Sequence, residues 1–514
     1  YQGDVKLFVD EYSKVIDLHP DYSHAYSNRA IGHEELGEYE KALSDYSKAI
    51  DIDGDVKDFL NRADAYLALE DYENALIDYN HLVDNDPQNV QYLLDRTACL
   101  EEMKKFDLAI NDLNKVLRID SLSDDAYYQK SFINWLELER IDLALLDMTK
   151  AIEINSNKPI YFTFRAGMFQ DLDSLDLVLP DLTKAIELDS NDAYTWHVRG
   201  DFYKSIGDVD NAIKDKLKAI AVDSLYTPAY EEVIEFYLEL GDIDNAEYFH
   251  SRLITLFSEN PVYYNNRADF YKTQENYDEA LKDYATVIEI STDDYSTSRA
   301  INNSANIYWA QEKWELCIEE YTKAIEIDEN ATYYSNRGRV YQIIKDYDNA
   351  IIDHTKAIEL DEENPELYDY RADCYEEMED YTNALKDYDK AIDLAPENPL
   401  YYNNRADFYK TQEKYDEALK DYATAIEIST DDYGTMRAIN NRAIIYEFQE
   451  KYDLAIEEYT KGLLIENHPL IFENRAAVYA YLEDYDKALA DFTSSIDLDK
   501  ENPQRYDDRA DCYI

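Results

Sequence analysis

Residues 26–50 decide the fold, and they read YSNRAIGHEELGEYEKALSDYSKAI. Tyr26 and Ala30 are four residues apart in the first part of the stretch, and Ala42 and Tyr46 have the same spacing in the second part. Apolar residues at this spacing share one face of a helix. The stretch therefore predicts two amphipathic helices joined by a turn, in which small alanines allow close approach and tyrosines fill the space between.

The same pattern recurs along the whole chain. When copies are aligned on the small residue that opens the second apolar run, successive copies lie 33 to 37 residues apart, most often 34. One copy is too thin to bury its apolar face alone, so stacked copies must form a solenoid and not one central core. The clearest further copies span residues 59–82, 264–287, 334–357, 368–391, 402–425 and 472–495.

The pattern closely resembles the tetratricopeptide repeat family over the whole chain. It departs from the family at the turn, where Gly37 of the first copy is replaced by glutamate in many others, such as Glu413. The resemblance implies an all-α fold, a right-handed α-solenoid superhelix of about 14 helix–turn–helix repeats plus half a repeat at each end, with a concave groove lined by the first helix of each repeat. The signature positions are held in one copy by Pro399, Tyr402, Ala406, Tyr409, Ala418, Tyr422 and Ala425.

The repeats follow one another without a gap, which predicts a single continuous solenoid over residues 1–514. We expect a lone second helix at about residues 3–18, complete repeats over residues 21–503 and a lone first helix at residues 504–514. The repeat frame at Tyr1 directly continues the frame at Ile514.

A block of four repeats is duplicated, at about residues 238–375 and 376–513. Residues 260–295 and 398–433 differ at only three positions. Both copies also carry the same three-residue extension, within residues 291–296 and 429–434.

The composition excludes several classes of partner. The chain has 112 acidic and 50 basic residues, a net charge of −62, which opposes binding to nucleic acid or to an anionic membrane. No run of about 18 apolar residues is present, so we expect no insertion into a membrane. The charge favours other proteins or peptides of basic or polar character. The sequence does not indicate a cellular compartment.

An arginine recurs three residues after the aromatic residue that opens each repeat, and an acidic residue recurs just before the aromatic residue of the second helix. The seventh repeat lacks both together, with Val233 and Phe249 in their places. We expect a structural, bidentate ion pair within each repeat. An anion-binding row of arginines is disfavoured because every arginine has a local acid. The expected pairs include Arg267 with Asp283, Arg371 with Asp387, and Arg405 with Asp421.

Asparagine occupies the position before this arginine position in eight repeats, and acidic residues follow it on the same helical face. In groove-binding members of the family that the chain resembles, asparagine at this place bonds the backbone of an extended peptide, and an amide can both donate and accept. The alternative is a solvated helix face. The predicted groove residues are Asn28, Asn61, Asn266, Asp269, Asn303, Asn336, Asp373, Asn404, Asp407, Asn441 and Asn474.

Other site patterns are incomplete. The family's carboxylate clamp needs basic residues one turn apart on a groove helix, and Arg299 with Asn303 or Arg437 with Asn441 keeps only half of that pattern. His354 falls at the position of Tyr46, which favours packing over metal binding. We therefore expect no catalytic, cofactor-binding or metal-binding residues.

These observations predict a non-enzymatic interaction scaffold with a groove rich in asparagine and acidic residues. The scaffold could bind segments of other proteins, or copies of the chain could associate head to tail. In the second case Ile514 of one chain would meet Tyr1 of the next and the repeat would continue into a filament, because such a contact does not close on itself. The in-frame ends are equally expected if the chain is an excerpt of a longer protein.

Overall fold

A computed structural model describes residues 2–430 and 432–513. Every regular element within those residues is a helix, which confirms the predicted all-α repeat fold. The chain divides into two compact units, an N-terminal unit (Tyr1–Phe249) and a C-terminal unit (His250–Ile514). Tyr1 and Ile514, on which the predicted head-to-tail junction depends, lie outside the described residues.

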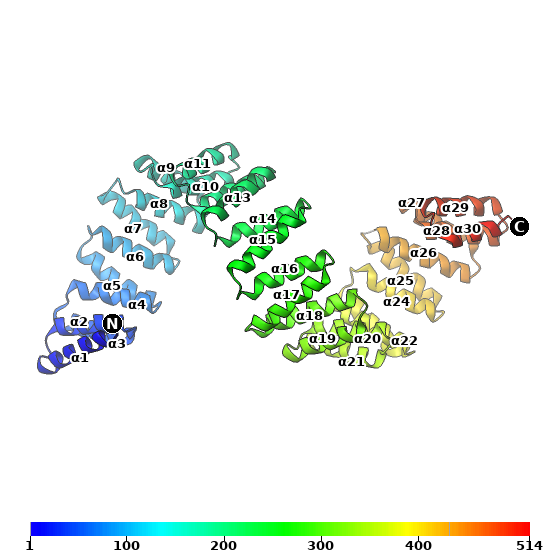
Figure 1. Ribbon diagram of the computed structural model, residues 1–514, viewed down its shortest axis with the longest axis horizontal. Coiled ribbons are helices and arrows are strands. Elements are labelled where there is room, and N and C mark those ends of the chain that lie inside the picture. The colour runs from blue at the N-terminus through cyan, green and yellow to red at the C-terminus, as the bar shows by residue number, and fades with distance from the viewer. Residues whose placement is uncertain (1, 431, 514) are drawn as a thin grey trace. The chain divides into compact units, whose positions relative to one another are not determined.

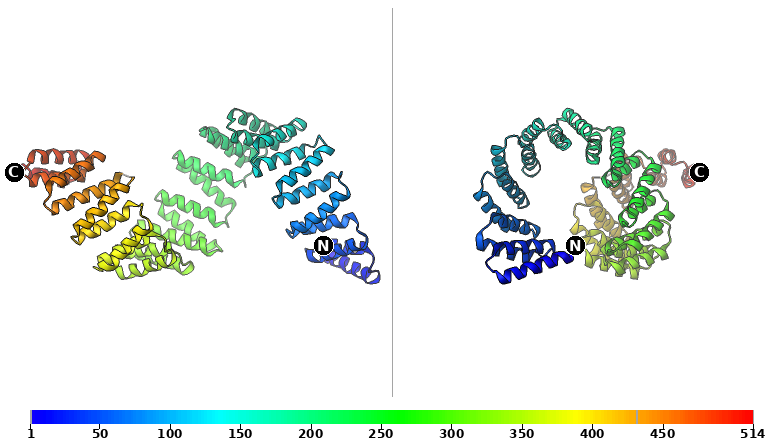
Figure 2. Two further views of the ribbon diagram at one scale, coloured as in Figure 1. Left: turned by 180° about the vertical axis from the view of Figure 1, so that it is seen from behind. Right: turned by 60° about the vertical axis from the view of Figure 1, so that its left-hand side comes forward.

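Helix pairs follow one another in chain order in the N-terminal unit (Figures 1 and 2). α1 (Gln2–Leu18) comes first and packs against the first pair. The first helices of the pairs are α2 (Ser23–Glu35), α4 (Val56–Ala68), α6 (Val90–Glu102), α8 (Asp124–Phe132), α10 (Pro159–Asp171), α12 (Ala193–Ser205) and α14 (Thr227–Glu239). The second helices are α3 (Tyr39–Asp53), α5 (Tyr72–Asn85), α7 (Phe106–Ile119), α9 (Ile141–Ile154), α11 (Leu175–Leu188), α13 (Val209–Val222) and α15 (Ile243–Leu256), the last of which continues into the C-terminal unit at His250.

The C-terminal unit continues the same alternation. Its first helices are α16 (Pro261–Thr273), α18 (Asp294–Ala310), α20 (Ala331–Ile343), α22 (Pro365–Glu377), α24 (Pro399–Thr411), α26 (Asp432–Phe448), α28 (Pro469–Tyr481) and the unpaired α30 (Pro503–Asp511). The second helices are α17 (Tyr277–Ile290), α19 (Trp314–Ile327), α21 (Tyr347–Leu360), α23 (Tyr381–Leu394), α25 (Tyr415–Ile428), α27 (Tyr452–Ile465) and α29 (Tyr485–Leu498). α18 and α26 have 17 residues where most first helices have 13, because both contain the duplicated extension.

Side chains cap many of these helices. Asn364 and Asn398 each precede a proline and accept the backbone N–H of the next residue but one, which satisfies a free donor at the start of α22 and α24. Asp71 and Asp380 cap the second helices α5 and α23 by accepting the backbone N–H of the third residue on, Asn74 and Asn383. These caps determine where each of the four helices begins.

The turn inside each repeat adopts a left-handed backbone even where glycine is missing. Gly37 has φ of 74°, and Glu413 at the same position of its repeat has φ of 58°. The next residue, Lys414, donates its N–H back to the carbonyl of Tyr409 and closes the turn. Ten other non-glycine residues share this conformation, namely Glu70, Lys104, Glu139, Asp173, Glu275, Glu312, Lys345, Glu379, Glu450 and Glu483.

One buried position of the second helix, held by Tyr46 and its equivalents, fills the space between the helices of each repeat. Tyr46, Tyr284 and Tyr422 are fully buried there. Two repeats place His354 and Lys216 at this position, both also fully buried. Gly338 and Gly200 lie opposite, where an added Cβ would come within 2.8 Å of the histidine and lysine side chains. In these two repeats the change at the tyrosine position is therefore matched by loss of a methyl group on the facing helix.

A π-helix at Ile133–Glu137 continues α8 and is the main irregularity of the repeat. This repeat has one extra residue, since Lys130 and Asp147 are 17 residues apart where the equivalent pairs are 16 apart. A π-helix absorbs one inserted residue without breaking the helix. It also places the Trp135 ring against Gly167.

An arginine on the first helix of most repeats forms a bidentate pair with an acid on the second helix. Arg371 Nε and Nη2 lie 2.7 and 2.9 Å from the two carboxylate oxygens of Asp387. The same two atoms lie 2.7 and 2.8 Å from the carboxylate oxygens in Arg267–Asp283 and Arg405–Asp421. The same bidentate geometry occurs in Arg29–Asp45, Arg62–Asp78, Arg96–Asp112, Arg165–Asp181, Arg199–Asp215, Arg337–Asp353 and Arg475–Asp491.

The arginine also connects neighbouring repeats. Arg371 Nη1 donates to the Thr355 hydroxyl at 3.0 Å, and Arg267 Nη1 donates to the Ser251 hydroxyl at 2.9 Å, in both cases on the preceding second helix. Three nitrogens of each guanidinium are thus used inside the solenoid. These arginines are structural, and they leave little capacity to bind an anion.

Replacing the left-handed glutamates by glycine should stabilise the protein. Glycine avoids the steric cost of a left-handed backbone, so Glu413→Gly should add about 1 kcal/mol to the free energy of unfolding. The measurement is urea unfolding followed by circular dichroism. Glu417→Gly, inside α25, is the matched control and should lower the free energy by about 1 kcal/mol. Equal effects of the two changes would contradict the assignment of turn strain.

Removing the acid of one ion pair should destabilise the protein strongly. Asp387 is 3% exposed, and Asp387→Asn leaves the Arg371 charge without its partner, so we expect a loss of about 3 kcal/mol in unfolding free energy. Asp389→Asn is the control, because Asp389 is half exposed and pairs with Arg405 at the surface. Its loss should stay below about 1 kcal/mol. Similar melting temperatures for Asp387→Asn and the parent protein would show that the pair is solvated.

Candidate functional site

In the C-terminal unit, successive first helices pack closer to one another than successive second helices do. α16 contacts α18, α20 contacts α22, and α24 contacts both α22 and α26. Successive second helices are separated by a first helix, so the first helices lie on the side of closer approach, which is the concave side. All predicted groove residues from Asn266 onward lie on these helices.

The asparagines of this row bond from one first helix to the preceding one. Asn404 Nδ2 donates to Asp369 at 2.8 Å, and Asn441 Nδ2 donates to Asp407 at 2.9 Å. Asn303 donates to Asp269 at 3.3 Å. The remaining links run from Asn336 to Asn302 at 3.2 Å and from Asn474 to Asn440 at 2.8 Å. The row is a ladder of amide and carboxylate groups, in which each of these asparagines directs its N–H group toward an earlier first helix.

The other predicted asparagines are placed differently. Asn28 donates to the carbonyl of His24 in its own helix at 2.8 Å. Asn266 is exposed on α16, and Asn61 is half-buried on α4 in the N-terminal unit. The structure does not bring these three residues into the ladder described above.

The predicted acids of the row bind the buried tyrosines. The hydroxyls of Tyr284, Tyr388 and Tyr422 donate to Asp269, Asp373 and Asp407, respectively. This contact joins the core to the concave face and fixes the orientation of each carboxylate.

The acids differ in how their charge is compensated. Lys410 and Arg437 bond Asp407 at 2.8 and 2.6 Å. Although burial opposes it, the hydrogen bonds from Lys410 and Tyr422 and the charge of Arg437 hold the pKa of Asp407 below its usual value. Lys272 bonds Asp269 at 2.9 Å in the same way. Within residues 2–430 and 432–513 no lysine or arginine forms an ion pair with Asp373.

A second polar row, two residues before the arginine position, was not predicted from the sequence. Asp369 is 5% exposed, and burial together with the nearby Asp373 raises the pKa of Asp369 to about 7. Asp373 reaches the groove surface, but the packing around its carboxyl group withdraws that group from water and raises its pKa to about 6. The sequence spacing could have indicated this row, because its positions lie four residues before the predicted acids and so share their helical face. The row consists of Asn265, Asn302, Ser335, Asp369, Asn403 and Asn440.

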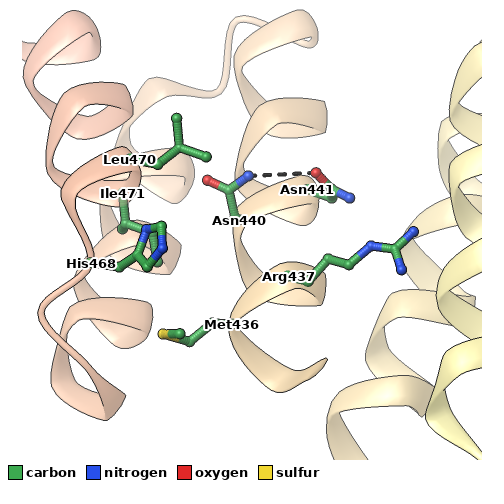
Figure 3. Close-up of a pocket in the computed structure, with 7 residues that line it drawn as sticks. All are labelled: Met436, Arg437, Asn440, Asn441, His468, Leu470 and Ile471. Atoms are coloured by element: carbon green, nitrogen blue, oxygen red, sulfur yellow. Dashed lines mark hydrogen bonds between the residues drawn. The ribbon is translucent and has the colours of Figure 1, made fainter. Parts of the chain in front are cut away.

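A pocket of about 290 Å³ lies between α26 and α28 (Figure 3). Met436 and Ile471 form its apolar part, and the Asn440 Nδ2 donates to the Asn441 side-chain oxygen Oδ1 at 3.5 Å on its polar side. Arg437 extends from the pocket toward the neighbouring helices. The volume of this pocket lies at the lower limit of the range of about 300–1,000 Å³ that is typical of ligand sites.

One cluster in the N-terminal unit has the spacing of metal ligands. His197, Asp201 and Glu232 place ligand atoms within 4.8 Å of one another. The buried Lys216 ammonium contacts both carboxylates and lies 2.9 Å from His197 Nδ1. The lysine thus supplies the positive charge that a bound cation would otherwise supply.

Known repeat families match much of the chain. Models described as tetratricopeptide repeat match residues 23–56, 59–89, 193–224, 261–330, 331–364, 365–398 and 398–463, which together exceed half of the chain. No curated protein sequence matches the chain. Among the described residues, no helix combines the length and apolar character needed to cross a membrane.

Several solved structures are similar to this chain. The Naa15/Naa10 complex bound to HypK-THB is 12% identical, with 99% of this chain and 93% of that chain covered and a TM-score of 0.43. Yeast Tom70 is 21% identical, with 96% and 95% covered and a TM-score of 0.39. The Cut9–Hcn1 hetero-tetramer is 14% identical, with 94% and 95% covered and a TM-score of 0.37.

The repeat spacing, the helix pairs and the family matches agree across both units. Stacked repeats of this kind present extended surfaces to other proteins, and this chain is a protein-interaction scaffold. The chain belongs to the tetratricopeptide repeat family.

Proposed function

We propose that the concave face of the C-terminal unit binds extended, polar or basic segments of other proteins, without catalysis. The ladder of amide and carboxylate groups on α16 to α28 supports this most directly, because five first helices, α18, α20, α24, α26 and α28, each donate an asparagine N–H to a neighbouring first helix. Where an asparagine gives its N–H to the preceding helix, its carbonyl oxygen can accept from a peptide N–H. A row of such acceptors suits the regularly spaced donors of an extended backbone.

The duplicated block supports the same assignment. Asp269, Arg299 and Asn303 recur as Asp407, Arg437 and Asn441, with the asparagine bonded to the acid in both copies. α18 and α26 have diverged elsewhere, for instance at buried Ser298 and Met436, yet they keep the arginine and both asparagines of the groove.

Peptide selection tests the proposed function. A random 12-residue library is panned on the full chain at 150 mM NaCl, and recovered peptides are measured by calorimetry. We expect Asn303→Ala with Asn441→Ala to weaken binding at least fivefold, because two backbone contacts are lost. Asn61→Ala, in the N-terminal unit, is the control and should change affinity less than twofold. A selection that recovers no binder, or binders indifferent to the double change, would rule out this groove.

Head-to-tail association of copies is a second candidate. Arg509 on α30 donates to Thr493 at 3.3 Å, as its equivalents do to the preceding repeat, but among the described residues it has no carboxylate partner. Ala510 is exposed, although the equivalent Ala476 is fully buried. On α1, Leu7 is 61% exposed. We propose that α30 of one chain packs on α1 of another and restores the repeat contact.

Sedimentation velocity over a range of concentrations tests this association. We expect the sedimentation coefficient to rise with concentration, more at 500 than at 50 mM NaCl, because salt screens the repulsion between chains of net charge −62. Ala510→Asp should abolish the rise, whereas Ala490→Asp, a matched change on α29, should leave it intact. A constant coefficient up to high concentration at both salt levels would exclude the association.

A further inference from the structure

On the concave face of the C-terminal unit, two acids of α22 form no ion pair with a lysine or arginine of the described residues. Asp369 and Asp373 are one turn apart on α22. Asp269 and Asp407, which occupy the position of Asp373 on α16 and α24, are each bonded by a lysine. Within the described residues no cation pairs with Asp369 or Asp373. The lack of an ion pair distinguishes Asp369 and Asp373 from Asp269 and Asp407.

Two buried oxygens at this place have no hydrogen-bond partner in the described structure. One is Asp369 Oδ1, and the other is Asn403 Oδ1, which occupies the equivalent position on the adjacent helix α24. Asn403 is 2% exposed, and its Nδ2 faces the Gly434 carbonyl on α26 at 3.5 Å, so its oxygen lies on the other side of the amide. A buried acceptor without a donor costs about 1–3 kcal/mol. The two orphan acceptors therefore favour a donor supplied from outside.

The groups around the acids make the site selective for a cation. Asp373 is exposed to the groove, while Asp369 is held beneath it by the Asn404 amide. Glu376 joins Asp373 in accepting the Tyr388 hydroxyl. Glu366 on α22 adds negative charge, and Arg437 on α26, the facing cation, is already engaged by Asp407.

Tyr370 takes the place that asparagine occupies in neighbouring repeats. Its ring lies 5.2 Å from the guanidinium carbon of Arg339, so its face already binds one cation. An aromatic face beside carboxylates suits lysine and arginine side chains in particular.

We propose that Asp369 and Asp373 form an anchor for one lysine or arginine side chain of the segment bound in the concave face. The ammonium or guanidinium group contacts Asp373 at the groove surface and supplies the donor that the buried Asp369 Oδ1 lacks. The inference rests on the proposed function and names the partner chemistry at one point of the same groove.

The anchor should make binding depend on pH in a defined direction. Both carboxyls have raised pKa values, about 7 for Asp369 and about 6 for Asp373, so they are ionised at pH 8 and largely protonated at pH 5. A bound cation favours the ionised forms. Affinity for a basic segment should therefore fall as the pH is lowered from 8 to 5.

The test uses a 12-residue peptide recovered from the library selection. We expect the peptide to contain lysine or arginine, and replacing that residue by glutamine should weaken binding at least tenfold. Asp369→Asn with Asp373→Asn should weaken binding of the original peptide by a similar factor and remove its pH dependence between pH 5 and 8. Asp416→Asn with Glu417→Gln, two exposed acids on α25, is the charge-matched control and should change affinity less than twofold.

The outcomes separate the anchor from the groove. Peptides that depend on Asn303 and Asn441 but bind equally well without their basic residue would overturn the anchor and leave the groove intact. An empty selection would overturn both. If the anchor is built for a partner and not for stability, Asp369→Asn should melt no lower than the parent protein at pH 8. A large drop in melting temperature would instead mark Asp369 as structural and count against the proposal.

Discussion

The rest of the structure depends on one constraint, that a pair of thin helices cannot bury its own apolar face. The alanine and tyrosine side chains of each repeat must pack against the next repeat, so the stability of the protein comes from contacts between neighbouring repeats. The arginine–carboxylate pair reinforces this chain, because Arg371 bonds Asp387 within its repeat and Thr355 in the preceding one. With the core and the ion pairs confined to the interior, the concave face is free to vary its chemistry from repeat to repeat.

Most of the fold could be predicted because local spacing determines it. The 34-residue period predicts the helix pairs, and the repeated positions of Arg405 and Asp421 within it indicate that the two side chains meet. The π-helix at Ile133–Glu137 was missed, since one inserted residue can be absorbed in the helix or in the turn and the sequence does not distinguish these. The left-handed glutamates were only partly foreseen, because glutamate has no local preference for that backbone and the packing of two helices imposes it.

The groove was harder to predict than the fold. Period and helical face placed Asn404 and Asp407 on one surface, and the structure places them there. Their partners depend on how adjacent first helices are offset, which is a property of packing and not of the period. Hence Asn404 bonds Asp369, a residue that was not predicted from the sequence. Likewise, the match between Gly338 and His354 joins positions 16 residues apart and is visible only once the two helices face each other.

A net charge of −62 attracts basic partners at long range but cannot by itself select among them, because salt at physiological concentration screens charges over about 8 Å. Selection requires acids that differ from the surrounding acids at short range. Asp407 is neutralised by Lys410 and Arg437 and therefore contributes geometry more than charge. Asp369 and Asp373 have no such ion pair, and the partial withdrawal of their carboxyl groups from water raises both pKa values, so a cation placed there gains more than it would at a fully solvated acid. Because lysines neutralise Asp269 and Asp407, a basic side chain can distinguish Asp369 and Asp373 from these two acids.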